Sequence, residues 1–225
     1  MVITHRAAGD AQKRERRRAI LDVALGLFRG HEFEEISMAE VARRAGLAKG
    51  TPYLYFGSKE ALFLALLADQ FDRWFDELDA GLGRLARASR ASTPRQLAGL
   101  FTRTVDHHPL LARLIAIGHA ILERNIDGAT ALGFKQALRV RLVRTGGLLE
   151  RCLPHPKPKE GQRLLLWIYT LVVGIQNVAE PAPVIKRILG MPGMECFRLQ
   201  FHDTFRQTLT ALLQGLWWKA NRRTR

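Results

Sequence analysis

Apolar residues recur along most of the chain with the spacing of amphipathic helices. In the first such segment Ile20, Val23, Ala24, Leu27 and Phe28 stand at i, i+3, i+4, i+7 and i+8. This spacing predicts a helix over about residues 12–30, which Gly30 ends. The same period predicts further helices over about 58–82, 93–106, 109–125, 129–152, 160–179 and 195–219, with loops at "PHPKPK" and "EPAPVIKRILGMPGM". No segment alternates like a strand, so the sequence predicts an all-α protein.

Two of the helix starts carry capping signals. In "SMAEVARRAG", Ser37 is followed three residues later by Glu40, the pattern of a capping box in which each side chain satisfies a backbone amide. Gly46 supplies a left-handed stop, which predicts a short helix over 38–45. The cap, first-turn proline and capping-box partner of a later helix are Thr93, Pro94 and Gln96.

Between the short helix and the long one from Ser58 lies "AKGTPYLYFG", residues 48–57, with room for a single helical turn. Pro52 near the start of that turn loses few hydrogen bonds, because first-turn amides lack partners anyway. Free amides at a helix start also suit a phosphate. Three short helices before a long one outline a helix-turn-helix unit on a helical body. We therefore predict a DNA-binding domain over 1–57 and a larger helical domain over 58–225.

Residues 19–67 resemble the DNA-binding domain of the TetR family of bacterial transcriptional regulators. The run "VARRAGLAKGTPYLYFGSKEAL" matches that family's pattern almost position by position. The resemblance covers roughly the first third of the chain; the remainder is similar to the family only in its helices and its length. It implies a cytoplasmic regulator, a repressor, that binds a palindromic operator as a homodimer.

The resemblance also implies which residues contact DNA. Ser37 would meet a phosphate through its amide, and Ala48 departs from the family pattern, where serine or threonine is common, so we expect Thr51 to cap the recognition helix instead. The DNA-contacting positions implied by the match are Ser37, Lys49, Gly50, Thr51, Tyr53, Tyr55 and Lys59. A solvated surface turn is the alternative for these side chains.

In TetR-like proteins the last two long helices of each subunit form a four-helix dimer interface. The two corresponding helices are the most apolar of this chain, and the last one carries a stripe at helical spacing. Core packing within one chain is the alternative. The residues predicted for the dimer interface are Phe201, Phe205, Leu209, Leu212 and Leu216.

Sparse polar and aromatic residues interrupt the apolar helices of the larger domain. Such residues are typical of a mostly apolar small-molecule site, although a lone core histidine is more often simply hydrogen-bonded. The candidates for contact with a small hydrophobic effector, with an acidic or polar end, are His119, Trp167, Tyr169, Gln176 and Asn177. A regulator without any effector remains an alternative. Gly146 and Gly147 in one helix predict either a close crossing or a kink.

The formal net charge is +14, of which residues 1–57 carry +3 (ten basic, seven acidic) and the rest +11. The basicity therefore does not single out the predicted DNA-binding domain, and it leaves open an architectural protein that coats DNA. The basic run "KRERRR", residues 13–18, is equally compatible with a solvated helix start and with an arm that reaches the DNA backbone or minor groove.

Other classes of chemistry find little support in the sequence. The two cysteines, Cys152 and Cys196, form no CxxC pair, and "DHHP" at 106–109 lacks the spacing of metal ligands. Catalytic motifs are not seen, so we predict neither an enzyme nor a metal site nor a cofactor. The longest apolar run, Leu164 to Ile175, is 12 residues, too short to span a bilayer, and the N-terminus lacks a signal peptide. We expect a soluble protein.

Overall fold

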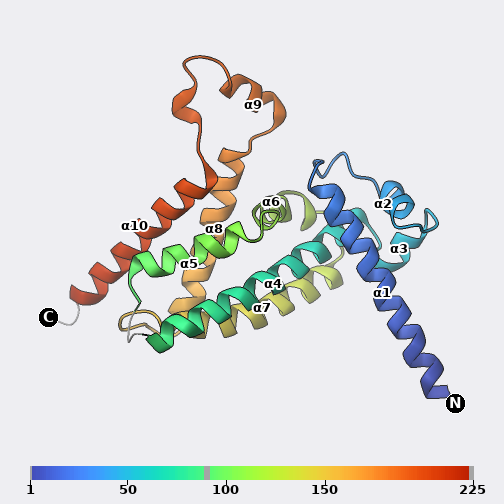
Figure 1. Ribbon diagram of the computed structural model, residues 1–225, viewed down its shortest axis with the longest axis horizontal. Coiled ribbons are helices and arrows are strands. Elements are labelled where there is room, and N and C mark those ends of the chain that lie inside the picture. Colours follow the sequence, from blue (N-terminus) through green and yellow to red (C-terminus); the bar gives the residue numbers. More distant parts are fainter. Residues whose placement is uncertain (1, 89–91, 223–225) are drawn as a thin grey trace. The chain divides into compact units, whose positions relative to one another are not determined.

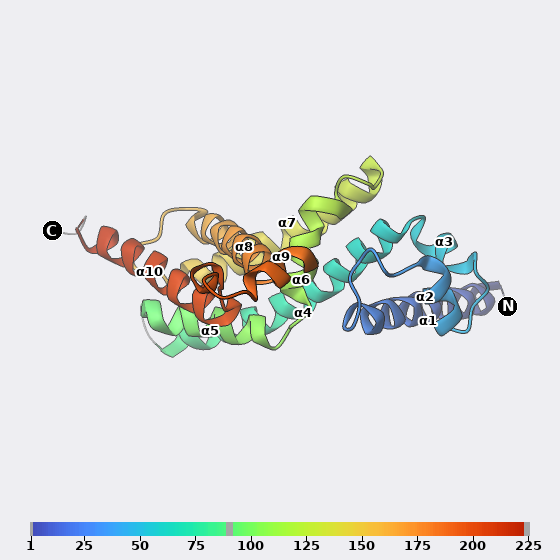
Figure 2. The same ribbon diagram turned by 90° about the horizontal axis from the view of Figure 1, so that it is seen from above.

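The computed structural model of the protein describes residues 2–88 and 92–222, and for residues 2–9, 119, 120 and 221 it describes the backbone alone. These residues form helices and no strand, which confirms the predicted class (Figures 1 and 2). The helices are α1 (Val2–Phe28), α2 (Met38–Arg44), α3 (Thr51–Phe56), α4 (Lys59–Ala88), α5 (Pro94–Asp106), α6 (Leu111–Ile117), the π-helical turn η1 (Gly118–Leu122), α7 (Gly128–Glu150), α8 (Glu160–Ala179), α9 (Pro183–Leu189), the 3₁₀ turn η2 (Glu195–Phe197) and α10 (Phe201–Arg222).

Two elements differ from the sequence prediction. The first helix begins at Val2, so the basic run 13–18 lies within α1 and not on an arm ahead of it. The segment expected to be a loop after residue 180 contains α9, because Pro183 takes the first-turn position where a missing N–H costs nothing. The capping box of α5 is confirmed, with Thr93 Oγ1 accepting from the Gln96 N–H and Gln96 Oε1 accepting from the Thr93 N–H.

The chain divides into two compact units. The first contains the residues up to Ala68 together with Gly118–Leu132, and the second contains Asp69–Ile117 together with the chain from Gly133 onward. The first unit therefore extends beyond the predicted boundary at residue 57. It includes the first turns of α4 and a later segment that sequence reasoning placed in the larger domain.

Aromatic packing forms the centre of the first unit. Phe63 of α4 meets Phe28 of α1 and Phe33 of the following loop edge-to-face, with ring centroids 5.3 and 4.9 Å apart. Val41 and Ala42 bury the inner face of α2 against this core. Edge-to-face pairs each add about 0.5–1.5 kcal/mol beyond burial, so the three rings fix α1 and α4 relative to the α2 loop.

The turn η1 also belongs to the first unit. Gly118 lies so close to Leu67 of α4 that a Cβ atom on it would stand 3.1 Å from the Leu67 Cδ2 atom. A larger residue at position 118 would therefore push on α4. π-Helical turns are rare and occur frequently at functional places.

Polar contacts hold α4 and α7 together within the second unit. Arg141 donates from Nε to Asp72 and from Nη1 to Asp76, each at 2.7 Å, and the Thr145 hydroxyl donates to Asp79 at 2.6 Å. The two carboxylates raise the pKa of the Arg141 guanidinium. This series of contacts fixes the register of α7 on α4.

α8 and α10 complete the second unit. α10 packs on α5 and α8, and α6 packs on α8 (Figures 1 and 2). α7 and α8 cross at Gly146 and Gly161, where a Cβ on Gly161 would clash with the Gly146 carbonyl oxygen. Of the two outcomes predicted for Gly146, the close crossing is thus the correct one. A Cβ on Gly147 would meet nothing within 4 Å.

None of the helices in the described part of the chain is by itself long and apolar enough to cross a bilayer. Taken together, α8 and α9 reach the required length and composition, but their axes bend by 69° at the break between them.

Candidate DNA-binding site

The turn between α2 and α3 is built by a glycine. Gly46 takes a left-handed conformation with φ of 67°, as the sequence predicts. The Gly46 N–H donates to the Arg43 carbonyl at 3.2 Å and the Leu47 N–H donates to the Ala42 carbonyl at 2.9 Å. These two bonds form a Schellman motif, which ends α2 within one residue and turns the chain toward α3.

The start of α3 differs from the prediction that Thr51 caps it. Gly50 is the N-cap residue, and no side chain caps the helix. The Thr51 N–H instead donates to the Ala48 carbonyl at 2.8 Å, so a backbone turn before the helix takes the place of a cap. Pro52 is buried and anchors the helix to the domain, and the Arg17 guanidinium of α1 lies 5.1 Å from the ring centre of Phe56 at the other end.

α3 presents one face to solvent. Lys49, Gly50 and Tyr53 are exposed on it, while Thr51 and Tyr55 are half-buried. Gly50 has an ordinary negative φ of −82°, and a Cβ there would meet nothing within 4 Å. The fold of the chain itself therefore does not require glycine at this position, which is consistent with a close approach by something outside the chain.

Leu54 is the residue of this face that the sequence analysis missed. Its side chain is 83% exposed, more than any other large apolar residue described, and it stands next to Tyr53 at 51%. The sequence held one signal for Leu54, because it places this apolar residue on the side of α3 opposite the buried Pro52. Leu54 therefore adds a large exposed apolar side chain to the face of α3 on which Tyr53 is exposed.

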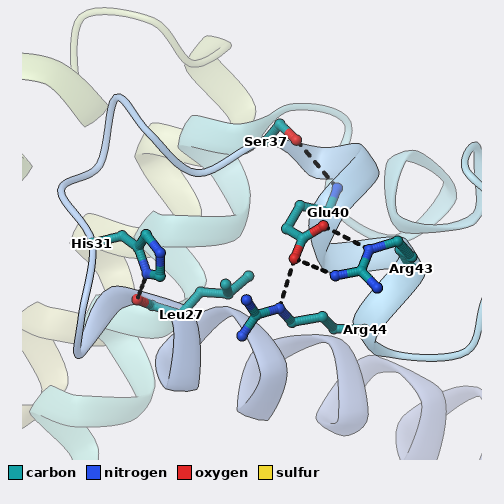
Figure 3. A network of polar contacts seen from close by, with 6 residues as sticks. All are labelled: Leu27, His31, Ser37, Glu40, Arg43 and Arg44. Atoms are coloured by element: carbon teal, nitrogen blue, oxygen red, sulfur yellow. Dashed lines mark hydrogen bonds and ion pairs between the residues drawn. The ribbon is translucent and has the colours of Figure 1, made fainter.

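Ser37 and Glu40 form only half of the predicted capping box. Ser37 Oγ accepts from the Glu40 N–H at 3.2 Å, but the Glu40 carboxylate turns to the two arginines at the end of α2 (Figure 3). Arg43 donates to both carboxylate oxygens at 2.7 and 2.8 Å, and Arg44 donates to one at 2.7 Å. Hydrogen bonds from Arg43 and then Arg44 lower the pKa of Glu40 to about 2. The ionised carboxylate therefore positions both guanidinium groups on the surface of α2.

Lys59 is the predicted DNA contact whose side chain is engaged within the chain itself. Its Nζ atom donates to the Phe33 carbonyl at 2.8 Å and to the Ile36 carbonyl at 3.0 Å, and it lies 4.0 Å from the centre of the Phe33 ring. The side chain is thus bound to the loop between α1 and α2. It fixes that loop to the start of α4 instead of extending from the face of α3.

The residues predicted to contact an effector are not brought together. Trp167 and Asn177 lie on the outer, exposed face of α8, whereas Gln176 is buried and Tyr169 half-buried, seven residues apart on one side of the helix. His119 falls in η1, and its side chain lies outside the described part of the chain. Only Tyr169 and Gln176 remain candidates on the inner face of α8.

The predicted dimer stripe divides in a similar way. Phe205 and Leu209 are fully buried within the single chain, where α10 packs on α5 and α8, so they belong to its core and not to a surface open to a partner. Phe201, Leu212 and Leu216 are half-buried. Helical spacing identified the apolar side of α10, but that side is covered by the chain's own helices.

Two family models match the sequence. One, described as "Bacterial regulatory proteins, tetR family", matches residues 20–66, and the other, described as "Tetracyclin repressor-like, C-terminal domain", matches residues 68–219. The second match alone spans more than half of the chain. The protein belongs to the TetR family.

Individual relatives agree with this assignment. The HTH-type transcriptional repressor KstR of Mycolicibacterium smegmatis is 36% identical over 201 residues, which cover 83% of this chain and 90% of that protein. KstR of Mycobacterium tuberculosis is 27% identical over 197 residues and covers 83% of each chain. The regulator FadR from Bacillus subtilis, solved in complex with stearoyl-CoA, shares the fold with a TM-score of 0.55 at 16% identity, over 88% of this chain and 98% of that one.

This TetR-family chain is a DNA-binding transcriptional regulator, as the sequence predicts. Its helix-turn-helix is the pair α2 and α3 joined by the Gly46 turn. The exposed face of α3 is the candidate DNA-binding site.

Proposed function

We propose that the protein is a homodimeric repressor whose two copies of α3 enter successive major grooves of a palindromic operator. The observation that carries this proposal is the exposed face of α3, where Tyr53 and Leu54 extend from a helix anchored by the buried Pro52 and the exposed Lys49 lies just before it. Half-sites about 34 Å apart would match one turn of DNA.

The residues of α3 divide into phosphate and base contacts. Lys49, the backbone at Gly50, and the hydroxyls of Tyr53 and Tyr55 suit phosphates, which fix position but carry no sequence information. The Thr51 hydroxyl and the Leu54 side chain suit base edges, because a leucine can contact the methyl group of thymine. Ser37 at the start of α2 would contribute its amide to a further phosphate.

Dimerisation is supported by the outer faces of α8 and α10. Between Arg163 and Glu180, and again between Arg206 and Lys219, neither helix carries a charged residue. Their exposed residues are Leu166, Trp167, Thr170, Gly174, Asn177 and Val178 on α8, and Gln207, Thr208, Ala211, Gln214, Gly215 and Trp218 on α10. Uncharged outer faces with small residues at their centres are what two closely packed helix pairs need, so these faces replace the buried stripe as the proposed interface.

The proposed effector is a small, largely apolar molecule with an acidic or polar end. FadR, a structural neighbour of the same fold, was solved with stearoyl-CoA, whose acyl chain is apolar and whose other end is acidic. In this chain Tyr169 and Gln176 face inward from α8, and η1 contacts α4 at Leu67 through Gly118. A ligand that displaced η1 would move α4, and with it the helix-turn-helix.

The proposal is tested by selecting a binding sequence from random DNA with the purified protein and then measuring affinity for it. We expect a palindrome bound by one dimer. We expect Tyr53→Ala, which removes one phosphate contact, to weaken binding by less than the roughly 1–3 kcal/mol of a base contact while the dimer stays folded. A selected sequence without two-fold symmetry, or unchanged affinity of the Tyr53 variant, would contradict the assignment of α3.

A further inference from the structure

The connection between α8 and α10 is an ordered projection without a core. We call residues 180–200, which contain α9 and η2, the α9 arm; in Figure 1 it extends from the top of α8 and α10. Neither α9 nor η2 has a buried residue. Exposed large apolar side chains occur along the arm at Val184, Ile185, Ile188, Met191, Phe197 and Leu199, with Phe197 at 59%.

Polar contacts hold the arm in one shape despite its exposure. Arg198 donates from Nε to the Leu189 carbonyl and from Nη2 to the Met191 carbonyl, which ties the segment before α10 to the end of α9. Lys186 pairs with Glu180 at 2.8 Å. A segment that fixes its backbone while leaving six large apolar side chains in water is typical of a surface that another molecule covers.

We propose that the α9 arm packs against a second copy of this chain, on the far ends of its α8 and α10. The inference rests on the proposed dimer through the outer faces of these helices. It adds a second contact region, in which the α9 arm of each subunit packs against the other subunit.

The direction of the two helices determines where the arm would land. α8 enters the arm by its C-terminal end and α10 leaves it by its N-terminal end. Trp167 of α8 and Trp218 of α10 therefore lie remote from the arm, Trp167 by about 18 Å along the helix. A two-fold axis that passes through the centres of the outer faces and runs across the helices would place each arm beside the partner's remote ends.

The distribution of residue size along the outer faces fits this arrangement. The centres carry Thr170 and Gly174 on α8 and Ala211 and Gly215 on α10, which allow helices to approach closely. The exposed tryptophans stand at the remote ends, Trp218 at 62% exposure. Arg163 lies 5.2 Å from the Trp167 ring centre and Arg222 lies 4.5 Å from that of Trp218, so both rings are held in place before any partner arrives.

The size and charge of the arm also favour a second copy of the chain as the molecule that covers it. The outer faces contribute twelve residues, six from each helix, whereas a stable interface uses roughly 20–30 residues a side. The arm, which begins two residues after the exposed Val178 of α8, supplies six further large apolar residues. Within the arm Lys186 forms an ion pair with Glu180, and Arg198 forms one with Glu195. Docking of the arm would therefore bury few unpaired charges.

The first test measures the dimer dissociation constant of the full chain by sedimentation over a dilution series. We expect Ile185→Ser combined with Phe197→Ser to weaken the dimer at least about tenfold, since apolar anchors dominate interfaces. The matched control is Val140→Ser combined with Val143→Ser, two comparably exposed residues of α7. Equal weakening by both pairs, or none by the arm pair, overturns the proposal.

Cys196 gives a second measurement that does not depend on mutating the arm. It is exposed in η2 while Cys152 is buried, so a photoreactive maleimide labels the arm selectively. In a mixture of labelled and isotopically heavy chains, we expect cross-links from Cys196 to the partner's residues 163–170 or 215–222. Cross-links confined to one chain overturn the proposal.

The outcomes separate this inference from the dimer itself. If Ala211→Glu abolishes the dimer while the arm pair leaves it unchanged, the outer-face dimer stands and the arm proposal fails. A wild-type chain that stays monomeric at all concentrations removes the dimer as well. Arm-dependent binding to anionic lipid vesicles with an unchanged dimer would assign the arm to a membrane surface and overturn the proposal.

Discussion

At the scale of single residues, Lys59 and Leu54 show what the sequence pattern of the recognition region leaves undetermined. Lys59 matches a DNA-contacting position, yet its Nζ atom is bound by the Phe33 and Ile36 carbonyls. Leu54 belongs to no such position, yet it is the most exposed large apolar side chain described. The sequence predicts which segment meets DNA, but the direction of each side chain follows from the loop that packs beside it.

A first prediction concerns Leu54 and the thymine methyl group. Leu54→Ala should weaken operator binding by about 1 kcal/mol, roughly fivefold, through loss of apolar contact. On an operator whose thymines are replaced by deoxyuridine, which lacks the methyl, wild type should weaken by a similar amount and the variant by clearly less, because alanine covers less of that methyl group. Leu132→Ala, exposed on α7, is the control. Equal losses for wild type and variant on the deoxyuridine operator would exclude the contact.

A second prediction reassigns Lys59 to stability. Lys59→Ala removes two hydrogen bonds from a charged donor, so it should lower the free energy of unfolding by about 1.5–3 kcal/mol in urea denaturation. Lys59→Met, which keeps the aliphatic chain, should recover only the packing part of that loss. Lys49→Ala should leave the unfolding free energy unchanged and weaken DNA binding. Were Lys59→Ala as stable as wild type and defective in DNA binding, the sequence-based assignment would be right after all.

At the scale of elements, the sequence predicts where helices form more reliably than it predicts what each apolar helix face packs against. The Gly46 stop and the Thr93 cap follow from local chemistry and are confirmed, whereas at Gly146 the sequence left a close crossing and a kink open, and packing against Gly161 decides between them. The stripe on α10 has the correct helical period, but Phe205 and Leu209 face the chain's own core. Periodicity identifies an apolar side and cannot distinguish α5 and α8 from a second subunit as its partner.

A third prediction separates core from interface on α10. Ala211→Glu places a charge at the centre of the proposed interface and should yield folded monomers by light scattering, with operator binding lost because one half-site binds weakly. Leu209→Glu buries an unpaired charge in the core of the single chain and should unfold it. A stable dimer of the Ala211 variant would move the interface away from α10.

A fourth prediction concerns the hydrogen bonds that Arg43 and Arg44 donate to the Glu40 carboxylate on α2. Its pKa of about 2 lies below the ordinary 4.5, so its stabilising contribution is complete above pH 4.5 and is lost as the pH falls toward 2. The difference in urea midpoint between wild type and Glu40→Gln should therefore be constant from pH 7 to pH 5 and shrink below. A difference that already disappears by pH 5 would show that Arg43 and Arg44 do not hold the carboxylate in solution.

At the scale of the whole molecule, the TetR-family assignment was available from residues 19–67, but the division of the chain was not. The first unit recruits Gly118–Leu132 from far along the sequence, and only packing reveals that Gly118 meets Leu67. Similarly, the effector candidates were chosen because they are polar or aromatic, but they do not lie together. On α8 the side chains of Trp167 and Asn177 are exposed on the outer face, while Gln176 is buried on the inner face. Local patterns carry no information about such long-range placement.

A fifth prediction concerns the linkage between effector and operator. To shift the protein from 99:1 bound to 1:99, an effector needs about 5.5 kcal/mol of differential affinity between the two conformations. Operator DNA must then weaken effector binding by the same factor. Long-chain acyl-CoA is the first probe, and calorimetric titration with and without operator measures the coupling. Acyl-CoA that binds with equal affinity in both conditions would not act by releasing DNA.

DNase I footprinting on DNA that contains the selected sequence decides whether the protein is a dimeric regulator of a discrete site. We expect protection of one palindrome whose half-sites are about one helical turn apart, with flanking DNA cut normally at saturating protein. A chain with a net charge of +14 offers a clear alternative, an architectural protein that coats DNA. Protection that spreads evenly along the fragment as protein is added would show such a coating protein and rule out the dimeric regulator of one site.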